Sequence, residues 1–165
     1  MAHRLRPALI FLAAAAWLAG CDQQRIEKLE EGVATESDVR KQFGDPTLIT
    51  EKADGSKDFE YPRQPEGTTN YRISIGADGK MSALRQLLNP ASVAKIQAGM
   101  AQAEVRRALG KPAKTQRYAL KPDEEVWEWH YLDGHQKKLF VVTYGADQKV
   151  LSTASTEDLR ESMPK

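Results

Sequence analysis

The feature that most constrains the fold is an internal repeat. Two segments of similar length, residues 26–46 and 93–112, match once a single residue is skipped. The matched pairs are Ile26 with Val93, Leu29 with Ile96, Gly32 with Gly99, Val33 with Met100, Val39 with Val105, Phe43 with Leu109, Gly44 with Gly110 and Pro46 with Pro112. The match continues downstream, where 59–61 falls on 127–129 and 76–80 falls on 145–149. Because a repeat of this length indicates a duplicated structural unit, we expect two copies of one fold.

Each copy begins with a pattern typical of two helices. Glycine adopts a left-handed conformation at little cost, so the first helix is expected to end at Gly32 or at Gly99. Thr35 and Asp38 have the spacing of an N-cap for the second helix, and apolar residues four apart follow on one helical face. A Gly-x-Pro sequence then ends this helix in both copies, because proline cannot continue it.

The remainder of each copy is typical of strands. In the second copy residues 126–131 and 139–144 are separated by the turn sequence Asp133-Gly134, and a short last strand starts at Val150. The first copy has shorter equivalents at 59–61, 71–75 and 81–84. The sequence therefore predicts an α+β fold with two tandem units, each with two helices packed on a three-stranded antiparallel sheet. The predicted units are 26–88 and 89–155, with a C-terminal tail at 156–165.

The N-terminus has the layout of a bacterial lipoprotein signal peptide. A basic stretch precedes an apolar run at 8–18, which is shorter than the roughly 20 residues that span a bilayer as a helix. Leu18-Ala19-Gly20-Cys21 resembles the lipobox, so we expect 1–20 to be removed and Cys21 to carry diacylglycerol and a further acyl chain such as palmitate. Residues 21–25 would form a lipid-anchored tether. The alternative is an ordinary cysteine, but a lone cysteine cannot form an intramolecular disulfide.

Charge and composition exclude some partners. Removal of residues 1–20 takes away two arginines and no acidic residue, so the formal net charge changes from +1 to −1. Neither the strong basic field needed to bind nucleic acid nor a polybasic run that would attract a membrane is present. We therefore expect no nucleic-acid partner, and membrane attachment through the lipid anchor.

Residues suited to catalysis or metal binding are sparse. After processing only His130 and His135 remain as histidines, which is too few for a zinc site with three or four ligands. No serine lies in a G-x-S-x-G sequence, and residues 76–79 lack the strand-to-helix context of a phosphate loop. We expect no enzyme activity, no catalytic residue, no metal and no cofactor, and we expect His130 to face solvent.

Aromatic residues are the better candidates for the core and for binding. Trp127 and Trp129 fall on one face of the predicted strand and are expected to fill the space beneath the helices, with a binding face as the alternative. The Pro-rich segment 61–67 is expected to be a surface loop, where function often resides. Tyr and Arg are enriched at interaction hot spots, so Tyr61 and Arg63 are the predicted binding residues. A plain strand connection is the alternative.

The second copy resembles the SmpA/OmlA (BamE-like) lipoproteins. The resemblance rests on K-I-x-x-G-M…EV…ALG-x-P at 95–112, followed by Trp127 and Trp129, and it covers most of 93–155. The first copy fits less well, with Val33 in place of Met and Phe43 in place of Leu. The resemblance implies the fold given above, a lipid anchor, and a small component that binds the outer-membrane β-barrel assembly machine, its other lipoproteins and anionic phospholipid. The tandem arrangement instead resembles that of the β-lactamase inhibitor proteins.

The sequence therefore favours a non-enzymatic, periplasm-facing lipoprotein that acts through protein contacts. Its expected role is an accessory in outer-membrane protein assembly or envelope integrity, with envelope proteins such as barrel-assembly components as partners. The alternative is a tandem module that captures or inhibits a periplasmic enzyme, and a third possibility is a lipid or small-ligand carrier. Asp22 resembles the inner-membrane retention signal of enterobacteria, so the inner membrane is an alternative to the expected outer membrane.

Overall fold

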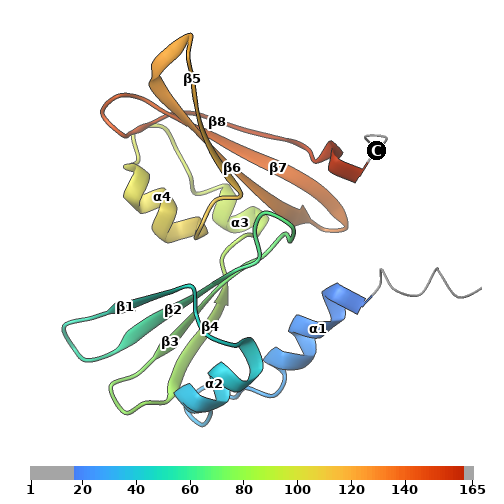
Figure 1. Cartoon of the computed structure of the whole chain (residues 1–165), viewed down its shortest axis with the longest axis vertical. Helices are drawn as coiled ribbons and strands as arrows, with labels where there is room; N and C mark the ends of the chain where they lie inside the picture. The colour runs from blue at the N-terminus through green and yellow to red at the C-terminus, as the bar shows by residue number, and fades with distance from the viewer. Residues whose placement is uncertain (1–16, 162–165) are drawn as a thin grey trace, which may run out of the picture.

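The chain forms two modules of the same design, one after the other. The computed structural model describes residues 17–161, and the side chains of residues 22–160. The first module contains α1 (Trp17–Ile26), α2 (Glu36–Phe43), β1 (Leu48–Glu51), β2 (Lys57–Pro62), β3 (Asn70–Ile75) and β4 (Met81–Gln86). The second contains α3 (Pro90–Val93), α4 (Gln102–Leu109), β5 (Lys114–Tyr118), β6 (Lys121–Asp133), β7 (Gln136–Tyr144), β8 (Val150–Glu157) and the 3-10 helix η1 (Leu159–Glu161) (Figure 1). No helix in this described part is long and apolar enough to cross a bilayer.

The predicted fold class is wrong, because each module has a four-stranded antiparallel sheet and the chain is mostly β. The strand orders are β1-β2-β3-β4 and β5-β6-β7-β8. The missed strands are β1 and β5, which start just after the two Gly-x-Pro sequences. All four β1 side chains and four of the five in β5 are exposed. These edge strands therefore lack the apolar–polar alternation by which a half-buried strand is recognised in a sequence.

The first helix of each module ends well before the glycine at which it was expected to end. α1 ends at Ile26 and α3 spans only four residues. The matched glycines serve the sheets: Gly32 donates its N–H to the carbonyl of Met81, and Gly99 donates to Val150, both at 2.8 Å. Their φ angles are 80° and 88°, which favour glycine. Both glycines therefore fix the chain against the start of the last strand and do not end a helix.

The second helix of each module begins and ends largely as predicted. Thr35 caps α2: its hydroxyl accepts from the Asp38 N–H at 3.2 Å, and the Asp38 carboxylate accepts from the Thr35 N–H at 2.9 Å. At α4 the residue before the helix is Ala101, which has no side chain that could cap it, so only one bond of this pair is present: the Ala101 N–H donates to the Glu104 carboxylate at 2.8 Å. Both helices end at a glycine with positive φ, as expected for a helix stop.

Each module has its own hydrophobic core between its sheet and its helices. The first core is centred on Val39, Phe43, Phe59, Tyr61, Tyr71, Ile73, Ile75 and Met81. The second is centred on Leu88, Val93, Ile96, Val105, Leu109, Trp129, Tyr131, Phe140, Val142, Tyr144 and Val150. Trp129 is fully buried and Trp127 packs partly buried against the same core, which confirms the predicted core position of this pair.

The modules are stacked so that α3 and α4 lie between the two sheets (Figure 1). α2 covers the opposite face of the first sheet. From α4, Arg106 reaches across to Glu60 on β2 at 2.8 Å, and Arg72 binds the same carboxylate at 3.2 Å. Glu60 is consequently buried on the sheet face that points away from its own core. The second module therefore covers part of the outer face of the first sheet.

Candidate anchor site and module junction

Arg63, one of the two predicted binding residues, binds the side chain next to the predicted lipid-modified cysteine. Its Nε and Nη2 atoms donate to the two carboxylate oxygens of Asp22 at 3.0 and 3.1 Å. Arg25 adds a longer contact of 3.4 Å to the same carboxylate. The Arg63 and Asp22 side chains are 28% and 18% exposed. A bidentate arginine–carboxylate ion pair that is partly shielded from water is stronger than a typical surface ion pair.

Tyr61, the other predicted binding residue, lies in the core, so the expectation of an exposed side chain is wrong. It is 2% exposed, and its hydroxyl donates to the carbonyl of Gly44 at 3.1 Å. Its ring lies 5.2 Å from that of Phe43, centroid to centroid. Burial raises the pKa of Tyr61 to about 12. β2 continues to Pro62, so Tyr61 follows the inward alternation of Phe59 and does not begin a loop.

The predicted processing site lies at the edge of the described part of the chain. The signal peptide at 1–20 lies outside the described residues, apart from the backbone of 17–20, and so does the side chain of Cys21. The predicted tether at 21–25 belongs to α1. Ile26 and Leu29 pack on the core of the first module. From Asp22 onward the chain is therefore bound to the first module.

A glutamine in the β2–β3 loop joins the first module to a strand of the second. Gln64 donates from Nε2 to the carbonyl of His130 at 2.8 Å, and its Oε1 accepts from the His130 N–H at 3.1 Å. Both residues are buried. The side-chain amide thus satisfies both backbone groups of one β6 residue, as a neighbouring strand would.

Asn70 makes a second polar link, at the end of α4. Its Nδ2 donates to the carbonyls of Leu109 at 2.8 Å and Lys111 at 2.9 Å, and the residue is 1% exposed. A Cβ on Gly110 would lie 2.9 Å from the same nitrogen. The last carbonyls of a helix have no partner within the helix, so an asparagine of one module satisfies two acceptors of the other.

His130 is buried at this junction, so the expectation that it faces solvent is wrong. Its Nδ1 lies 2.9 Å from a carboxylate oxygen of Asp158, and Arg160 binds that carboxylate at 2.7 Å. Arg160 also donates to the carbonyl of Pro65 in the first module. The segment that follows β8 covers this face of the sheet, and strand alternation does not reveal such a distant contact. Burial and the positive charge of Arg160 lower the pKa of His130, against the opposing effect of Asp158.

This environment predicts a loss of stability on mild acidification. The pKa of His130 is lower in the folded chain than its ordinary value of about 6.5. As the pH falls through 6.5, His130 therefore takes up a proton in the unfolded chain before it does so in the folded chain, and the proton favours the unfolded state. The free energy of unfolding should therefore fall as the pH decreases from 7.5 through 6.5 toward the folded-state pKa. Urea unfolding of the native chain and of His130→Gln at several pH values measures this, and the variant should have a shallower slope. His135→Gln, at an exposed turn, is the control. Equal slopes for the native chain and His130→Gln would exclude this role.

The remaining polar cluster surrounds Glu125, which lines a cavity of about 250 Å³. Its carboxylate accepts from Trp127 Nε1 at 2.8 Å, from Arg117 at 2.9 Å and from Gln102 at 3.3 Å. These donors lower the pKa of Glu125. Within residues 17–161 no group of three or more His, Cys, Asp or Glu side chains is placed to hold a metal ion. The Glu125 carboxylate is already bound by three groups of its own module.

Sequence reasoning missed Gln64 and Asn70 as junction residues. One signal could have indicated Gln64: the β2–β3 connection runs from 63 to 69, whereas the equivalent β6–β7 turn is only Gly134-His135. A longer loop in one copy of a repeat indicates a role outside its own module. The longer connection carries Gln64 and Pro65 to the second module.

Comparisons with known proteins yield distant structural likenesses. No family model matches the sequence, and no curated protein matches it. Among solved structures, a DUF4309 family protein (YjgB) from Bacillus subtilis is 18% identical with a TM-score of 0.34, over 82% of this chain and 86% of that one. An extracellular protein with an SCP domain from Bacillus anthracis is 10% identical with a TM-score of 0.30, over 81% of this chain and 45% of that one. Likenesses with TM-scores this low assign no function.

Proposed function

We propose that this chain is a membrane-anchored binding protein of the bacterial envelope, without a reactive centre, that presents two joined modules to other proteins. Its proposed role is an accessory in outer-membrane protein assembly or envelope integrity. The resemblance of residues 93–155 to the SmpA/OmlA lipoproteins motivates that role, although the four-stranded sheets depart from the expected pattern. Cys21 is the proposed lipid attachment site.

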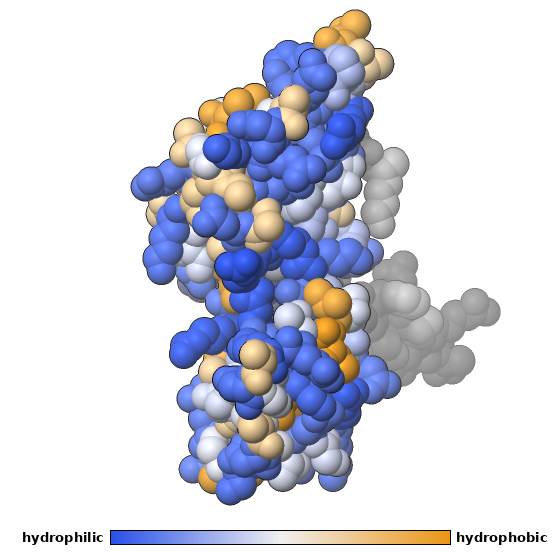
Figure 2. All heavy atoms as spheres, turned by 90° about the vertical axis from the view of Figure 1, so that its left-hand side faces the viewer, coloured by the Kyte–Doolittle hydropathy of each residue, from blue (hydrophilic) through white to orange (hydrophobic). Residues whose placement is uncertain are grey.

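The observation that carries the proposal is the apolar tip of the β5–β6 hairpin. Leu120 is 96% exposed and Tyr118 is 46% exposed. The hairpin projects from the end of the second module, and hydrophobic atoms occupy the top of the molecule in Figure 2. Arg117 and Lys121 flank the tip and are 63% and 65% exposed. An exposed apolar side chain surrounded by aromatic and arginine side chains is typical of protein–protein contact sites.

The first module shows that the fold does not need this tip. Its equivalent hairpin, β1–β2, turns at 52–56, where the sequence Lys-Ala-Asp-Gly-Ser contains no large apolar side chain. There Asp54 accepts from the backbone N–H and the hydroxyl of Ser56 at 2.9 and 2.7 Å, so the turn is satisfied internally. Because one copy of the unit folds with a polar turn, the apolar residues of the other copy are better explained by a partner than by folding.

The same hairpin also favours the alternative function. A projecting loop with an exposed apolar side chain can enter a cavity, as an inhibitor does with an enzyme's active site. A tandem module that captures or inhibits a periplasmic enzyme is therefore the second candidate. The two proposals share the contact surface and differ in the partner.

Photo-crosslinking in cells tests the contact and identifies the partner. A photoreactive phenylalanine analogue replaces Leu120, and a matched chain carries it in place of Asp54 at the other hairpin tip. We expect adducts from position 120 and few from position 54. Recovery of barrel-assembly components from position 120 supports the accessory role, and recovery of one soluble hydrolase supports the alternative. Equal, weak labelling at both positions would contradict the contact proposal, and turnover of a substrate by the purified protein would contradict the absence of a reactive centre.

A further inference from the structure

We propose that Arg63 positions the membrane anchor, so that the lipid leaves the protein at the module junction and holds the β5–β6 hairpin tip away from the membrane. This inference rests on the proposed function, because it requires a lipid on Cys21. It adds the orientation that the two modules take on the membrane. It also identifies Asp22 and Arg63 as the pair that sets this orientation.

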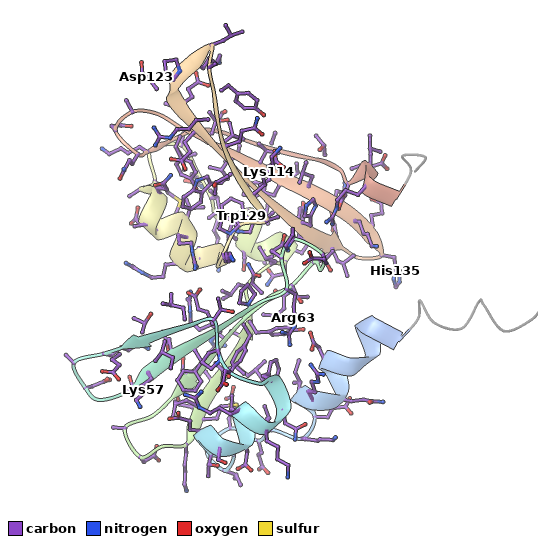
Figure 3. All side chains as sticks on the ribbon, viewed as in Figure 1. Lys57, Arg63, Lys114, Asp123, Trp129 and His135 are labelled. Carbon is purple, nitrogen blue, oxygen red and sulfur yellow. The ribbon has the colours of Figure 1, made fainter. Side chains whose placement is uncertain are left out.

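The Arg63 side of the pair is rigidly supported. The Arg63 N–H donates to the carbonyl of Thr69 at 3.0 Å, and its carbonyl accepts from the Gly67 N–H at 2.6 Å. The guanidinium carbon lies 5.7 Å from the ring centroid of Phe43, whose side chain is in the first core. Figure 3 shows Arg63 on the side of the first sheet that faces α1. The planar guanidinium is therefore held ready to bind a carboxylate with two parallel bonds.

The Asp22 side is supported as well. Four residues further along α1, Ile26 packs on the first core, and Leu29 follows it. Glu31 then accepts a hydrogen bond from the N–H of Leu84 on β4 at 3.1 Å. The segment from Asp22 to Glu31 thus has contacts at both ends. A chain fixed in this way is not a flexible tether, and the backbone at Cys21 has a defined position relative to the first sheet.

The position of Arg63 determines which side of the molecule faces the membrane. Two residues beyond it, Pro65 accepts a hydrogen bond from Arg160. The neighbouring Asp158 N–H donates to the carbonyl of Lys137 at 3.0 Å, next to the β6–β7 turn. These contacts place the turn at His135 on the same side as Arg63 and the start of α1 (Figure 3). That side should therefore lie closest to the lipid.

The hairpin tip lies at the other end of the second module. β6 connects the two ends without interruption, from Lys121 beside the tip to Asp133 beside the turn. Thirteen residues at about 3.3 Å each give an upper limit of roughly 40 Å for this span, which the register shift opposite Arg117 and Tyr118 shortens. An anchor that leaves the protein near His135 therefore places Leu120 several nanometres from the membrane, where a protein partner can reach it.

Fluorescence quenching on vesicles tests the orientation. Lipidated protein is inserted into phosphatidylcholine vesicles that contain a headgroup-linked quencher. Cys21 is the only cysteine and its thiol carries the lipid, so His135→Cys or Leu120→Cys introduces the single reactive thiol for a fluorophore. We expect the label at 135 to be quenched at least threefold more than the label at 120. In the Arg63→Ala background the quenching ratio should fall toward one. Arg63→Lys keeps the positive charge but cannot donate two parallel hydrogen bonds to Asp22, so its ratio should lie between those of the native protein and Arg63→Ala.

The matched control is Arg40→Ala, which removes an arginine of the first module that binds Glu36 at 2.9 Å and Asp45 at 2.8 Å but does not contact Asp22. It should leave the quenching ratio unchanged, and circular dichroism should show that all variants are folded. A ratio of one in the native background, with the protein firmly on the vesicles, would overturn the orientation proposal alone. A ratio that Arg63→Ala does not lower would overturn the role of Arg63. A native protein that carries no lipid and does not bind vesicles would overturn this proposal together with the anchor assignment.

Discussion

Replacement of Trp129 by Ala should lower the free energy of unfolding by about 3–5 kcal/mol, the usual cost of removing a large aromatic side chain from a core. Trp129 is fully buried. Its ring lies 5.8 Å from that of Trp127 and 6.4 Å from that of Phe140, centroid to centroid. Alanine would leave a cavity between the sheet and the helices of the second module. Neighbouring rings that already pack against one another can fill only part of it.

The substitution should also weaken the junction between the modules. Trp129 Nε1 donates to the carbonyl of Gly110 at 3.1 Å. The carbonyls on either side of it, at Leu109 and Lys111, are those that Asn70 of the first module binds. One tryptophan therefore orders the short loop on which the other module docks. We expect Trp129→Ala to lower the unfolding midpoint of both modules, although its contacts lie in only one of them.

Urea unfolding followed by far-ultraviolet circular dichroism measures the effect. Trp129→Phe keeps much of the packing but leaves the Gly110 carbonyl without its donor, so it should cost about 1–2 kcal/mol. Leu120→Ala, at the exposed hairpin tip, is the control and should change the free energy of unfolding by less than about 0.5 kcal/mol. A change below about 1 kcal/mol for Trp129→Ala would be incompatible with a closely packed core position.

The sequence predicted those parts of the fold that depend on neighbouring residues. α2 follows from an N-cap signal, and both α2 and α4 follow from apolar residues four apart and a glycine stop, all within about ten residues. The turn at Asp133-Gly134 follows from local turn chemistry. β1 and β5 could not be recognised because an edge strand is held by backbone hydrogen bonds to one neighbour. Its exposed side chains do not have to alternate.

Prediction of the site failed where burial depends on a distant segment. Strand alternation placed His130 on the face away from the core, and it lies there, but the chain around Asp158 covers that face and Gln64 occupies the neighbouring strand edge. Arg63 was singled out for its residue type, yet the sequence contains no sign that its partner is Asp22, 41 residues earlier. Each of these contacts joins segments far apart in the chain. No local pattern encodes them.

Replacement of Cys21 by Ser should abolish membrane attachment. The thiol is the proposed site of the diacylglycerol, and a serine hydroxyl cannot take its place in the thioether bond. Each buried methylene of an acyl chain contributes about 0.8 kcal/mol, so the loss of several chains removes far more binding energy than the near-neutral protein surface can supply. We expect nearly all of the variant in the soluble fraction or as uncleaved precursor. Labelling of cells with radioactive palmitate, followed by membrane fractionation, measures both results.

The contrast with Arg63→Ala separates attachment from orientation. Cys21→Ser should remove the palmitate label and the membrane fraction together, whereas Arg63→Ala should keep both, because the arginine binds Asp22 and not the lipid. Leu120→Ala should also keep both, since the hairpin tip is remote from the anchor. If palmitate still enters Cys21→Ser, the lipid is attached elsewhere and the processing site is wrong. If Arg63→Ala alone releases the protein from the membrane, the ion pair contributes to attachment itself, and Arg63 would have to act on processing at Cys21 and not only on the direction in which the anchor leaves the fold.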